Sequence, residues 1–446
     1  MPSDPQYLET VRAGSLDGAL YLEDDLSGLP ALTRGAVLTA LSRAFDLAEN
    51  RRPGHAQRVA HIALSVAQEL HLPSRQVEEA FFGGLLHDVG MASTIFTDPD
   101  QVSSLRPMSP YGADAERDGN TTHTHIAEAV ATHCIAGART ARKLGLSEGV
   151  AAAIEQHHDR WSGFHLVQQT GRERGGWVSR IVAASDRLES MIDHDVSPLL
   201  VRRRGPELIS EMSGIEIDPR IAEAMDRAAR QDEFWLGLYD NEMHVQLMMV
   251  DSSDALPPGD LIDMLGVVSD VVDDRGNRPR GHGRRVADLS RVIAREHGMS
   301  EGRTALVQAA ALLQDLGTLG VPVSLMRKPD ILTVDEMAAM QMHPTYARDI
   351  VSELPGFGAV AWWIGCHHER IDGKGYPGML EEEEVPVEAQ IIGMAEVFIA
   401  LTSERSYRPA MTAEDAMEVI RGLGSTRFDH RLLPGFEMAL ASLDLV

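Results

Sequence analysis

A histidine and an aspartate stand side by side in an otherwise apolar stretch of this sequence. In "GGLLHDVG", His87 and Asp88 interrupt a run that is typical of a buried helix. A buried carboxylate is costly unless it is paired or binds a metal ion. Neutral imidazole and carboxylate together suit Fe, Mn, Zn or Ni, and one carboxylate can bridge two ions. The pair therefore points to a metal centre if further ligands converge on it.

Ligand-type residues recur farther along the chain at matching intervals. His55 and His87 are 32 residues apart, and so are His282 and Gln314. The surrounding text agrees, because "GHAQRVA" is matched by "GHGRRVA", "GGLLHDVG" by "AALLQDLG" and "EQHHDRWSG" by "GCHHERIDG". One histidine alone is most often a hydrogen-bonded core or surface residue, but a set repeated at fixed spacing is far more typical of a metal site. We therefore interpret the sequence as a duplicated unit that binds metal.

Helices are expected to position these residues. The stretches "RVAHIALSVAQELHL" and "RVADLSRVIAREHGM" place apolar residues three and four apart, whereas strand-like alternation is scarce. We predict an all-α fold of two tandem helical bundle domains, residues 1–250 and 256–446, which suits a chain of 446 residues. The expected linker is "DSSDALPPGD", residues 251–260, where Ser, Asp, Gly and Pro interrupt the periodicity.

Composition argues against several classes of function. The chain has 41 basic and 67 acidic residues, a formal net charge of -26, so we expect no nucleic-acid polymer as a partner. No apolar run approaches the roughly 18 residues of a membrane span, and the first residues lack a signal-peptide pattern, which predicts a cytoplasmic protein that does not bind membranes. The two cysteines, Cys134 and Cys366, are too few for a disulfide framework, and we expect both to be buried core residues.

The order of the ligand-type residues resembles that of the HD-GYP branch of the HD phosphohydrolases. The similarity covers nearly the whole chain, twice, and rests on the order H, HD, H, HH, D, to which the second copy adds "HHERIDGKGYPG" with its "GYP", "LTSERSYRPA" and "GSTRFDH". The resemblance implies an all-α protein with divalent transition metals, commonly iron or manganese, and the ligand types also allow zinc or nickel. It further implies hydrolysis of a cyclic dinucleotide, typically cyclic di-GMP.

In the first copy, the resemblance implies a complete site for two ions. Asp88 would bridge them, and Asp88 and His87 would be the catalytic residues. The implied ligands are His55, His87, Asp88 and Asp186 for one ion, and His133, His157 and His158 for the other. The "GYP" loop is absent from this copy, and "WSGFHLVQQTG" takes its place.

The second copy keeps the loop but has a damaged ligand set. Gln314 stands at the position of the HD histidine, and a glutamine amide is a poor ligand for a transition metal. The ligands still implied are His282, Asp315, His343, His367, His368 and Glu396. The residues implied to bind substrate are Gly375, Tyr376, Pro377, Arg405 and Arg408. In the loop, Gly373, Gly375 and Gly378 are expected to provide positive φ and close backbone approach.

Two other family positions are changed in both copies. The lysine that follows the HD motif is replaced by Met91 and Thr318. The glutamate that accompanies a third ion is replaced by Arg51 and Arg278. We therefore expect at most two ions per site.

These observations favour a phosphodiesterase whose first copy is catalytic, with the second copy a degenerate support or nucleotide sensor. Two alternatives stay open at this point. One is a non-catalytic cyclic-dinucleotide sensor or interaction protein, and the other is an HD phosphohydrolase that acts on another nucleotide. A homo-oligomer or a signalling-protein partner also stays open.

Overall fold

The computed structural model describes most of the chain and shows an all-α protein. The described residues are 28–48, 52–93, 121–162, 176–240, 243–251, 253–276, 278–404, 409–424 and 426–443, with only the backbone given for 121–130. Throughout these ranges the regular structure is helical, and the β-pairing described is limited to two isolated bridges, Ser213 with Ile217 and Asp372 with Glu381. The predicted all-α fold is confirmed. Among the helices of the described ranges, none has the length and apolar character needed to cross a bilayer.

The chain divides into two compact units. One comprises residues 33–254, and the other comprises residues 255–446 together with the described residues 28–32. Leu256 N donates to Leu32 O at 2.8 Å, which ties this short N-terminal segment to the second unit. The domain limits expected from the sequence, 1–250 and 256–446, stay a prediction.

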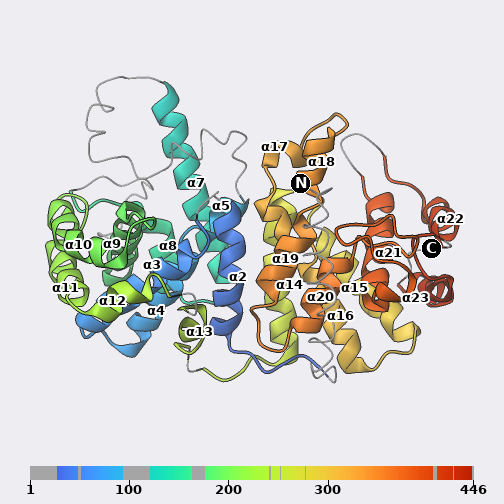
Figure 1. Ribbon diagram of the computed structural model, residues 1–446, viewed down its shortest axis with the longest axis horizontal. Helices are drawn as coiled ribbons and strands as arrows, with labels where there is room; N and C mark the ends of the chain where they lie inside the picture. The colour runs from blue at the N-terminus through green and yellow to red at the C-terminus, as the bar shows by residue number, and fades with distance from the viewer. Residues whose placement is uncertain are drawn as a thin grey trace. The chain divides into compact units, whose positions relative to one another are not determined.

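The first unit is a bundle around α3, α4, α8 and α9 (Figure 1). The helices of its described part are α2 (Arg34–Ala48), α3 (His55–Glu69), α4 (Ser74–Leu86), α5 (Val89–Ser93), α7 (Thr121–Lys143), α8 (Glu148–Gln156), α9 (Trp177–Met191), α10 (Pro198–Met212), α11 (Pro219–Ala229), α12 (Asp232–Gly237) and α13 (Met243–Met248). Ile62 of α3, Ala80 of α4 and Val182 of α9 belong to one buried apolar cluster, which continues to Ile221 and Trp235 on α11 and α12. Helices α10 to α12 lie on the side of the bundle away from α2 (Figure 1).

The start of α3 is fixed by a glycine and an aspartate. Gly54 has φ 83°, a left-handed conformation that suits glycine, and His55 is the first residue of the helix. The buried Asp46 carboxylate accepts hydrogen bonds from the backbone N–H groups of Gly54, at 2.7 Å, and Ala56, at 3.0 Å. These bonds satisfy N–H groups that a helix terminus leaves without intrahelical partners, and they set the position from which His55 projects.

A second glycine lets the turn at His87 and Asp88, between α4 and α5, approach α7 closely. A Cβ placed on Gly90, two residues after Asp88, would lie 1.9 Å from the carbonyl oxygen of His133. No larger residue fits there without a backbone shift. The glycine therefore allows α5 to pack on α7, which brings His133 toward Asp88.

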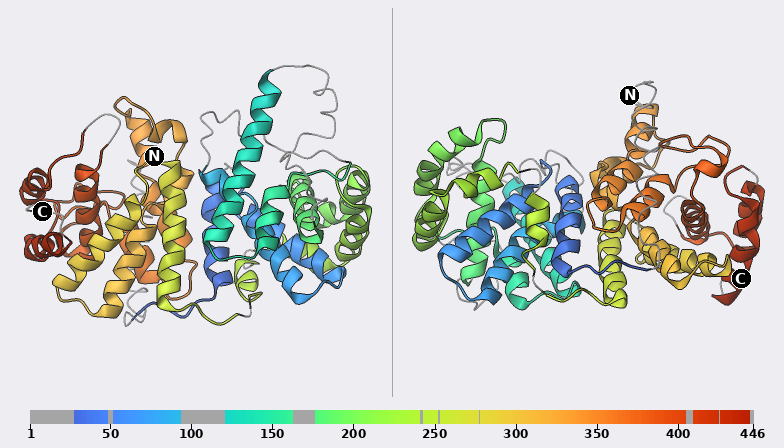
Figure 2. Two further views of the ribbon diagram at one scale, coloured as in Figure 1. Left: turned by 180° about the vertical axis from the view of Figure 1, so that it is seen from behind. Right: turned by 60° about the horizontal axis from the view of Figure 1, so that its bottom comes forward.

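The second unit repeats this plan and adds short helices. The helices of its described part are α14 (Pro258–Arg275), α15 (His282–Glu296), α16 (Glu301–Leu313), η3 (Leu316–Gly320), α17 (Val323–Met326), α18 (Val334–Met340), α19 (His343–Val351), α20 (Gly358–Cys366), η4 (Glu382–Glu384), α21 (Val387–Thr402), α22 (Ala413–Leu423), η5 (His430–Leu432) and α23 (Leu433–Ser442). Helices α22 and α23 lie side by side, and Arg421 on α22 pairs with Glu437 on α23 at 2.8 Å (Figure 2).

The repeat is visible in the backbone of the second unit. Gly281, before α15, has φ 71°, and Asp273 accepts a hydrogen bond from Gly283 N at 3.1 Å, as Asp46 does from the equivalent position in the first unit. A Cβ on Gly317 would lie 2.0 Å from His343 O, which reproduces the close approach at Gly90. Each unit thus positions its ligand-type residues with the same features: a capping aspartate, a left-handed glycine and a glycine at a close helix contact.

Candidate metal centre

Asp88 lies between two groups of histidines in the first unit. It follows His87, the C-cap of α4. Its Oδ2 lies 3.0 Å from Nε2 of His87, whereas its Oδ1 lies 3.2 Å from Nε2 of His157 and 3.4 Å from Nε2 of His133. The two carboxylate oxygens thus face different imidazoles, the arrangement that a carboxylate needs in order to bridge two cations.

Further ligand-type atoms extend the cluster on both sides of Asp88. On one side, Asp186 Oδ1 lies 3.5 Å from His55 Nε2 and 3.6 Å from His87 Nε2. On the other, Nε2 of His158 lies 3.3 Å from Nε2 of His133. The structure therefore brings together every first-copy residue predicted from the sequence: His55, His87, Asp88, His133, His157, His158 and Asp186.

The tautomers of two histidines are set by backbone carbonyls. His87 Nδ1 donates to Gly84 O at 2.8 Å, and His157 Nδ1 donates to Ile154 O at 2.6 Å. A carbonyl oxygen only accepts, so Nδ1 of each ring carries a proton, and Nε2 is the atom that points into the cluster. Within the described residues, the buried Nε2 of His87 has no hydrogen-bond partner. This donor atom fits a cation bound in the cluster.

Burial keeps the His158 ring in the form that binds metal. Burial, followed by the neighbouring rings of His157 and His133, lowers the pKa of His158 well below its ordinary value. The imidazole is therefore neutral at physiological pH, with a lone pair available for coordination.

Glu189 supports this cluster and was missed in the sequence analysis. Its carboxylate accepts from Nδ1 of His55 at 2.5 Å and from Nε of Arg58 at 2.6 Å. Its contact with Nε2 of His194 measures 3.0 Å. Burial by itself raises the pKa of Glu189, but His55, His194 and Arg58 hold it well below its usual range. An ionised Glu189 orients the His55 ring so that Nε2 faces Asp186.

A cysteine also lies beside the cluster. Cys134 and Cys366 are both buried, as predicted. The Sγ of Cys134, however, lies 3.6 Å from Nε2 of His133, within reach of the group formed by His133, His157 and His158. The sequence predicted only a core role for Cys134, whereas its position makes it a further candidate ligand.

The second unit retains one group of histidines. Nε2 of His343 lies 3.4 Å from Nε2 of His367, and the ring centroid of His368 is 5.0 Å from that of His343. His367 Nδ1 donates to Ile364 O at 2.6 Å, as His157 does to Ile154 in the first unit. Burial, together with His367, lowers the pKa of His343 to about 4. The three imidazoles fit one divalent cation.

The other half of the second site is occupied by an arginine. The guanidinium of Arg278 forms a two-pronged ion pair with Asp315, with Nη2 2.9 Å from Oδ1 and Nη1 in contact with Oδ2. Burial by itself raises the pKa of Asp315, but Arg278 holds it well below its usual range. The adjacent Gln314 is buried, and neither amide atom has a hydrogen-bond partner in the described part of the chain. The residues at this position therefore do not fit a metal ion, because the carboxylate already holds a cationic side chain.

The remaining predicted ligands of the second copy lie around this pair. His282 is buried at the start of α15. Asp315 Oδ1 is 3.8 Å from His343 Nε2, and Glu396 Oε2 is 3.9 Å from His368 Nδ1. Asp315 and Glu396 are thus near the histidine group, but the Asp315–His343 distance is longer than the matching Asp88–His133 distance of 3.4 Å.

The "GYP" loop covers the histidine group of the second unit. The Tyr376 ring stacks on His368, with centroids 4.7 Å apart and planes at 28°. The buried Glu369 carboxylate accepts from the backbone N–H groups of Gly378 and, at 3.0 Å, of Leu380, which fixes the loop. Pro377 follows Tyr376 in this loop, half-buried.

The two expected roles of the loop glycines, positive φ and close backbone approach, fall to different residues. Gly373 has φ 72°, whereas Gly375 and Gly378 are not in the positive-φ region. Gly375 instead serves close approach, since a Cβ there would lie 2.4 Å from Arg370 N. Arg405 and Arg408, the predicted basic residues for substrate binding, lie outside the described residues.

Comparison with protein families gives the identity of both units. Residues 52–191 match the HD domain, and residues 266–432 match a second family also described as an HD domain. The chain is a tandem HD-domain protein. The family and the tandem arrangement predicted from the sequence are confirmed, and so is the class, a metal-dependent phosphohydrolase.

Known relatives of this HD-domain protein are named as cyclic dinucleotide phosphodiesterases. The chain is 27% identical over 440 residues to the 3'3'-cGAMP-specific phosphodiesterase 3 of Vibrio cholerae serotype O1, which covers 91% of this chain and 94% of that protein. It is 35% identical over 179 residues to the cyclic di-GMP phosphodiesterase of Thermotoga maritima. That alignment covers 40% of this chain and 48% of that protein. The crystal structure of a cyclic GMP-AMP specific phosphodiesterase of V. cholerae has the same fold, with a TM-score of 0.63, 24% identity and coverage of 92% and 98% of the two chains.

Neither HD domain has a lysine three residues after the aspartate of its HD motif. Met91 is buried in the first domain. Thr318 is buried in the second, and its hydroxyl donates to Asp315 O at 2.7 Å. A lysine is thus absent from this position in both domains, as read from the sequence.

Proposed function

We propose that the chain is a metal-dependent phosphodiesterase that opens a cyclic dinucleotide, and that its preferred substrate is 3'3'-cGAMP. The bridging position of Asp88 carries the proposal, since it places one carboxylate between two sets of imidazole donors. Cyclic di-GMP was the substrate favoured by the sequence motifs. The relative that aligns along 91% of this chain is named for cGAMP, whereas the cyclic di-GMP enzyme aligns along 40%. This difference supports cGAMP as the better choice.

We assign catalysis to the first HD domain. One ion would be held by His55, His87 and Asp186 and the other by His133, His157 and His158, with Asp88 shared between them. Such a pair would supply a hydroxide nucleophile near pH 7 and stabilise negative charge on the phosphodiester. We expect Fe or Mn, because the ligands are imidazole and carboxylate.

The protein's own residues prepare this site in two ways. The carbonyls of Gly84 and Ile154 hold the Nδ1 protons of His87 and His157, so their Nε2 atoms are ready to bind without a change of tautomer. Glu189 does the same for His55. The cluster is thereby preorganised, which reduces the cost of ordering ligands around an ion.

The second HD domain is proposed to be non-catalytic. Arg278 neutralises Asp315, Gln314 replaces a ligand, and Tyr376 covers His368. This domain would hold at most one ion, at His343, His367 and His368, and would support the first domain or bind nucleotide.

The proposal predicts turnover of 3'3'-cGAMP by the full chain with Mn or Fe(II) under reducing conditions. We expect linear dinucleotide as product, with kcat/KM for cGAMP at least about tenfold above that for cyclic di-GMP. His87→Ala and His158→Ala should abolish product formation. Chromatography of the products with each substrate measures both ratios. Tight binding without product from any cyclic dinucleotide would identify a sensor, and turnover of mononucleotides alone would identify a different phosphohydrolase.

Glu189→Gln is predicted to weaken metal binding without removing a ligand. The amide cannot supply the negative charge that orients and polarises the His55 ring, so we expect metal affinity to fall about 10- to 100-fold. Isothermal titration with Mn measures the change. The matched control is His194→Gln, which keeps a donor near Glu189 Oε1 and should leave the affinity nearly unchanged. Equal loss in both variants would mean that Glu189 acts only by stabilising the fold.

A further inference from the structure

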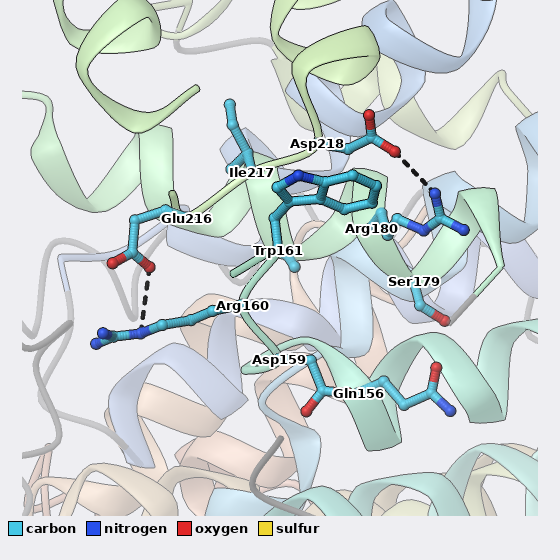
Figure 3. Close-up of a pocket in the computed structure, with 10 residues that line it drawn as sticks. Gln156, Asp159, Arg160, Trp161, Ser179, Arg180, Glu216, Ile217 and Asp218 are labelled. Atoms are coloured by element: carbon cyan, nitrogen blue, oxygen red, sulfur yellow. Dashed lines mark hydrogen bonds and ion pairs between the residues drawn. The ribbon is translucent and has the colours of Figure 1, made fainter. Parts of the chain in front are cut away.

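A pocket in the first HD domain is lined in part by residues that neighbour the paired histidines in the sequence (Figure 3). Gln156 and Asp159, which flank His157 and His158 in the chain, line one end of it. The pocket continues along α9 and ends at the segment 216–218 between α10 and α11. It is therefore part of the first domain alone.

The pocket lies within the length of a nucleotide from the candidate metal centre. Two of its lining residues, Ser179 and Ala183, are on α9, the helix that carries Asp186. They precede Asp186 by seven and three residues, or about 10 and 4.5 Å along the helix axis. A substrate with a phosphate at the metal centre could therefore place an adjoining group in this pocket.

Its charges do not suit a second phosphate. The Nε of Arg160 lies 3.3 Å from the Glu216 carboxylate, and Nη1 of Arg180 lies 2.8 Å from that of Asp218 (Figure 3). Asp159 adds a third acidic group to the lining. Two further guanidinium groups share these carboxylates, since Arg187 Nε lies 3.2 Å from Glu216 and Arg220 Nη2 lies 2.9 Å from Asp218. Both lining arginines are thus already paired with acids, so the pocket favours a neutral group over a second phosphate.

An aromatic face is held rigidly inside it. Trp161 N donates to Glu216 O at 3.1 Å, and Ser162 N donates to Ile215 O at 3.0 Å, which fixes this segment against the loop before α11. The guanidinium carbon of Arg180 is 5.6 Å from the Trp161 ring centroid. A fixed indole of this kind is a stacking platform for a nucleobase.

The pocket also presents an unsatisfied acceptor. Oε1 of Gln156 is buried and, within the part of the chain described, has no hydrogen-bond donor. A buried acceptor without a donor is unfavourable, so a ligand N–H would be stabilising here. The exocyclic amino groups of adenine and guanine supply such a donor.

We propose that this pocket binds one purine base of the cyclic dinucleotide, stacked on Trp161 with its amino edge toward Gln156. The proposal rests on the function proposed above and adds the part of the first domain that recognises the substrate. The second domain lacks this platform, since Ile371 follows its paired histidines at the position of Trp161. There the equivalent segment bonds to the "GYP" loop region instead, with Glu382 N donating to Ile371 O at 3.1 Å.

The test compares a purine substrate with one that has no base. Trp161→Ala in the full chain should lower kcat/KM for 3'3'-cGAMP at least about fivefold, mainly through KM, because stacking is lost. Trp161→Phe keeps an aromatic face and should recover most of this loss. Hydrolysis of bis(p-nitrophenyl) phosphate and metal content should stay at wild-type levels in both variants. The matched control, Ile371→Ala, removes side-chain volume at the same position of the second domain and should change none of these quantities.

Two outcomes would overturn the proposal. Unchanged cGAMP kinetics in Trp161→Ala would mean that no base occupies the pocket. A parallel loss of bis(p-nitrophenyl) phosphate hydrolysis or of metal would assign Trp161 a structural role. If the wild-type chain hydrolyses neither compound, the proposed function fails, and calorimetric titration of cGAMP into wild-type and Trp161→Ala proteins decides the pocket separately. Binding that is weakened at least about fivefold by the substitution supports the base site, and equal or absent binding refutes it.

Discussion

Asp88→Asn is expected to remove metal from the first HD domain and to lower kcat for 3'3'-cGAMP at least about 100-fold. The amide has nearly the same shape as the carboxylate, but it lacks the charge and the second oxygen ligand. Oδ1 and Oδ2 face different histidines, so both predicted ions lose a ligand at once. The loss should therefore exceed the 10- to 100-fold effect that is usual when only a supporting residue is changed. Elemental analysis and initial rates on the same preparation measure the two effects.

The second domain supplies the control for this prediction. Asp315 occupies the position of Asp88, but its carboxylate is paired with Arg278. Asp315→Asn should leave activity within about threefold of wild type, since surrounding residues of that domain take no part in the proposed chemistry. Circular dichroism checks that both variants remain helical. If Asp315→Asn removes activity and Asp88→Asn does not, catalysis has been assigned to the wrong domain.

The sequence predicted the first-domain cluster because its ligands are carried by a repeated spacing. The interval from His55 to His87 spans α3, the turn after it and α4, and the duplication shows that this spacing matters. Gly90 and Gly317 make the same close approach in both domains, so the backbone that joins the ligands is repeated as well. The all-α fold follows from the same helical periodicity.

Residues that act without a repeated partner could not be found in this way. Glu189 has Ile399 as its counterpart in the second domain, so comparing the copies gave no signal for it. A usable signal was its place three residues after Asp186 on one helix, which puts both side chains on the same face. The Trp161 pocket unites segments from three parts of the chain, and that proximity exists only in the fold.

Arg278 shows a different limit of the sequence. The arginine at this position argued against a third ion, but the sequence did not show where its side chain points. In the structure its guanidinium reaches Asp315, the residue that would otherwise bridge two ions. Arg278 thus replaces the glutamate that would bind a third ion, and its guanidinium also takes the place of a metal cation beside Asp315.

Removing Arg278 and restoring the HD histidine together are expected to add about one metal ion to the second domain. The full-length chain would carry Asp88→Asn, which silences the first site, with Arg278→Ala and Gln314→His. A unit charge about 4 Å from a cation costs roughly 4 kcal/mol at an effective dielectric constant of 20, so a divalent ion is strongly disfavoured while the guanidinium is in place. Without it, Asp315 is free to bind metal beside the new histidine. Elemental analysis counts the ions per chain.

Gln314→His alone is the informative control, because it restores a ligand but leaves Arg278 paired with Asp315. We expect no additional ion in this variant. A gain of metal from Gln314→His alone would show that the missing imidazole, rather than the arginine, keeps the site empty of a second ion. A gain only when Arg278 is also replaced would show that the guanidinium competes directly with metal for Asp315. In the second HD domain, the arginine guanidinium would then have replaced the second metal ion. This replacement keeps the charge of the buried Asp315 carboxylate balanced, which preserves the fold. It removes the catalytic chemistry because a guanidinium cannot activate water as a metal ion does.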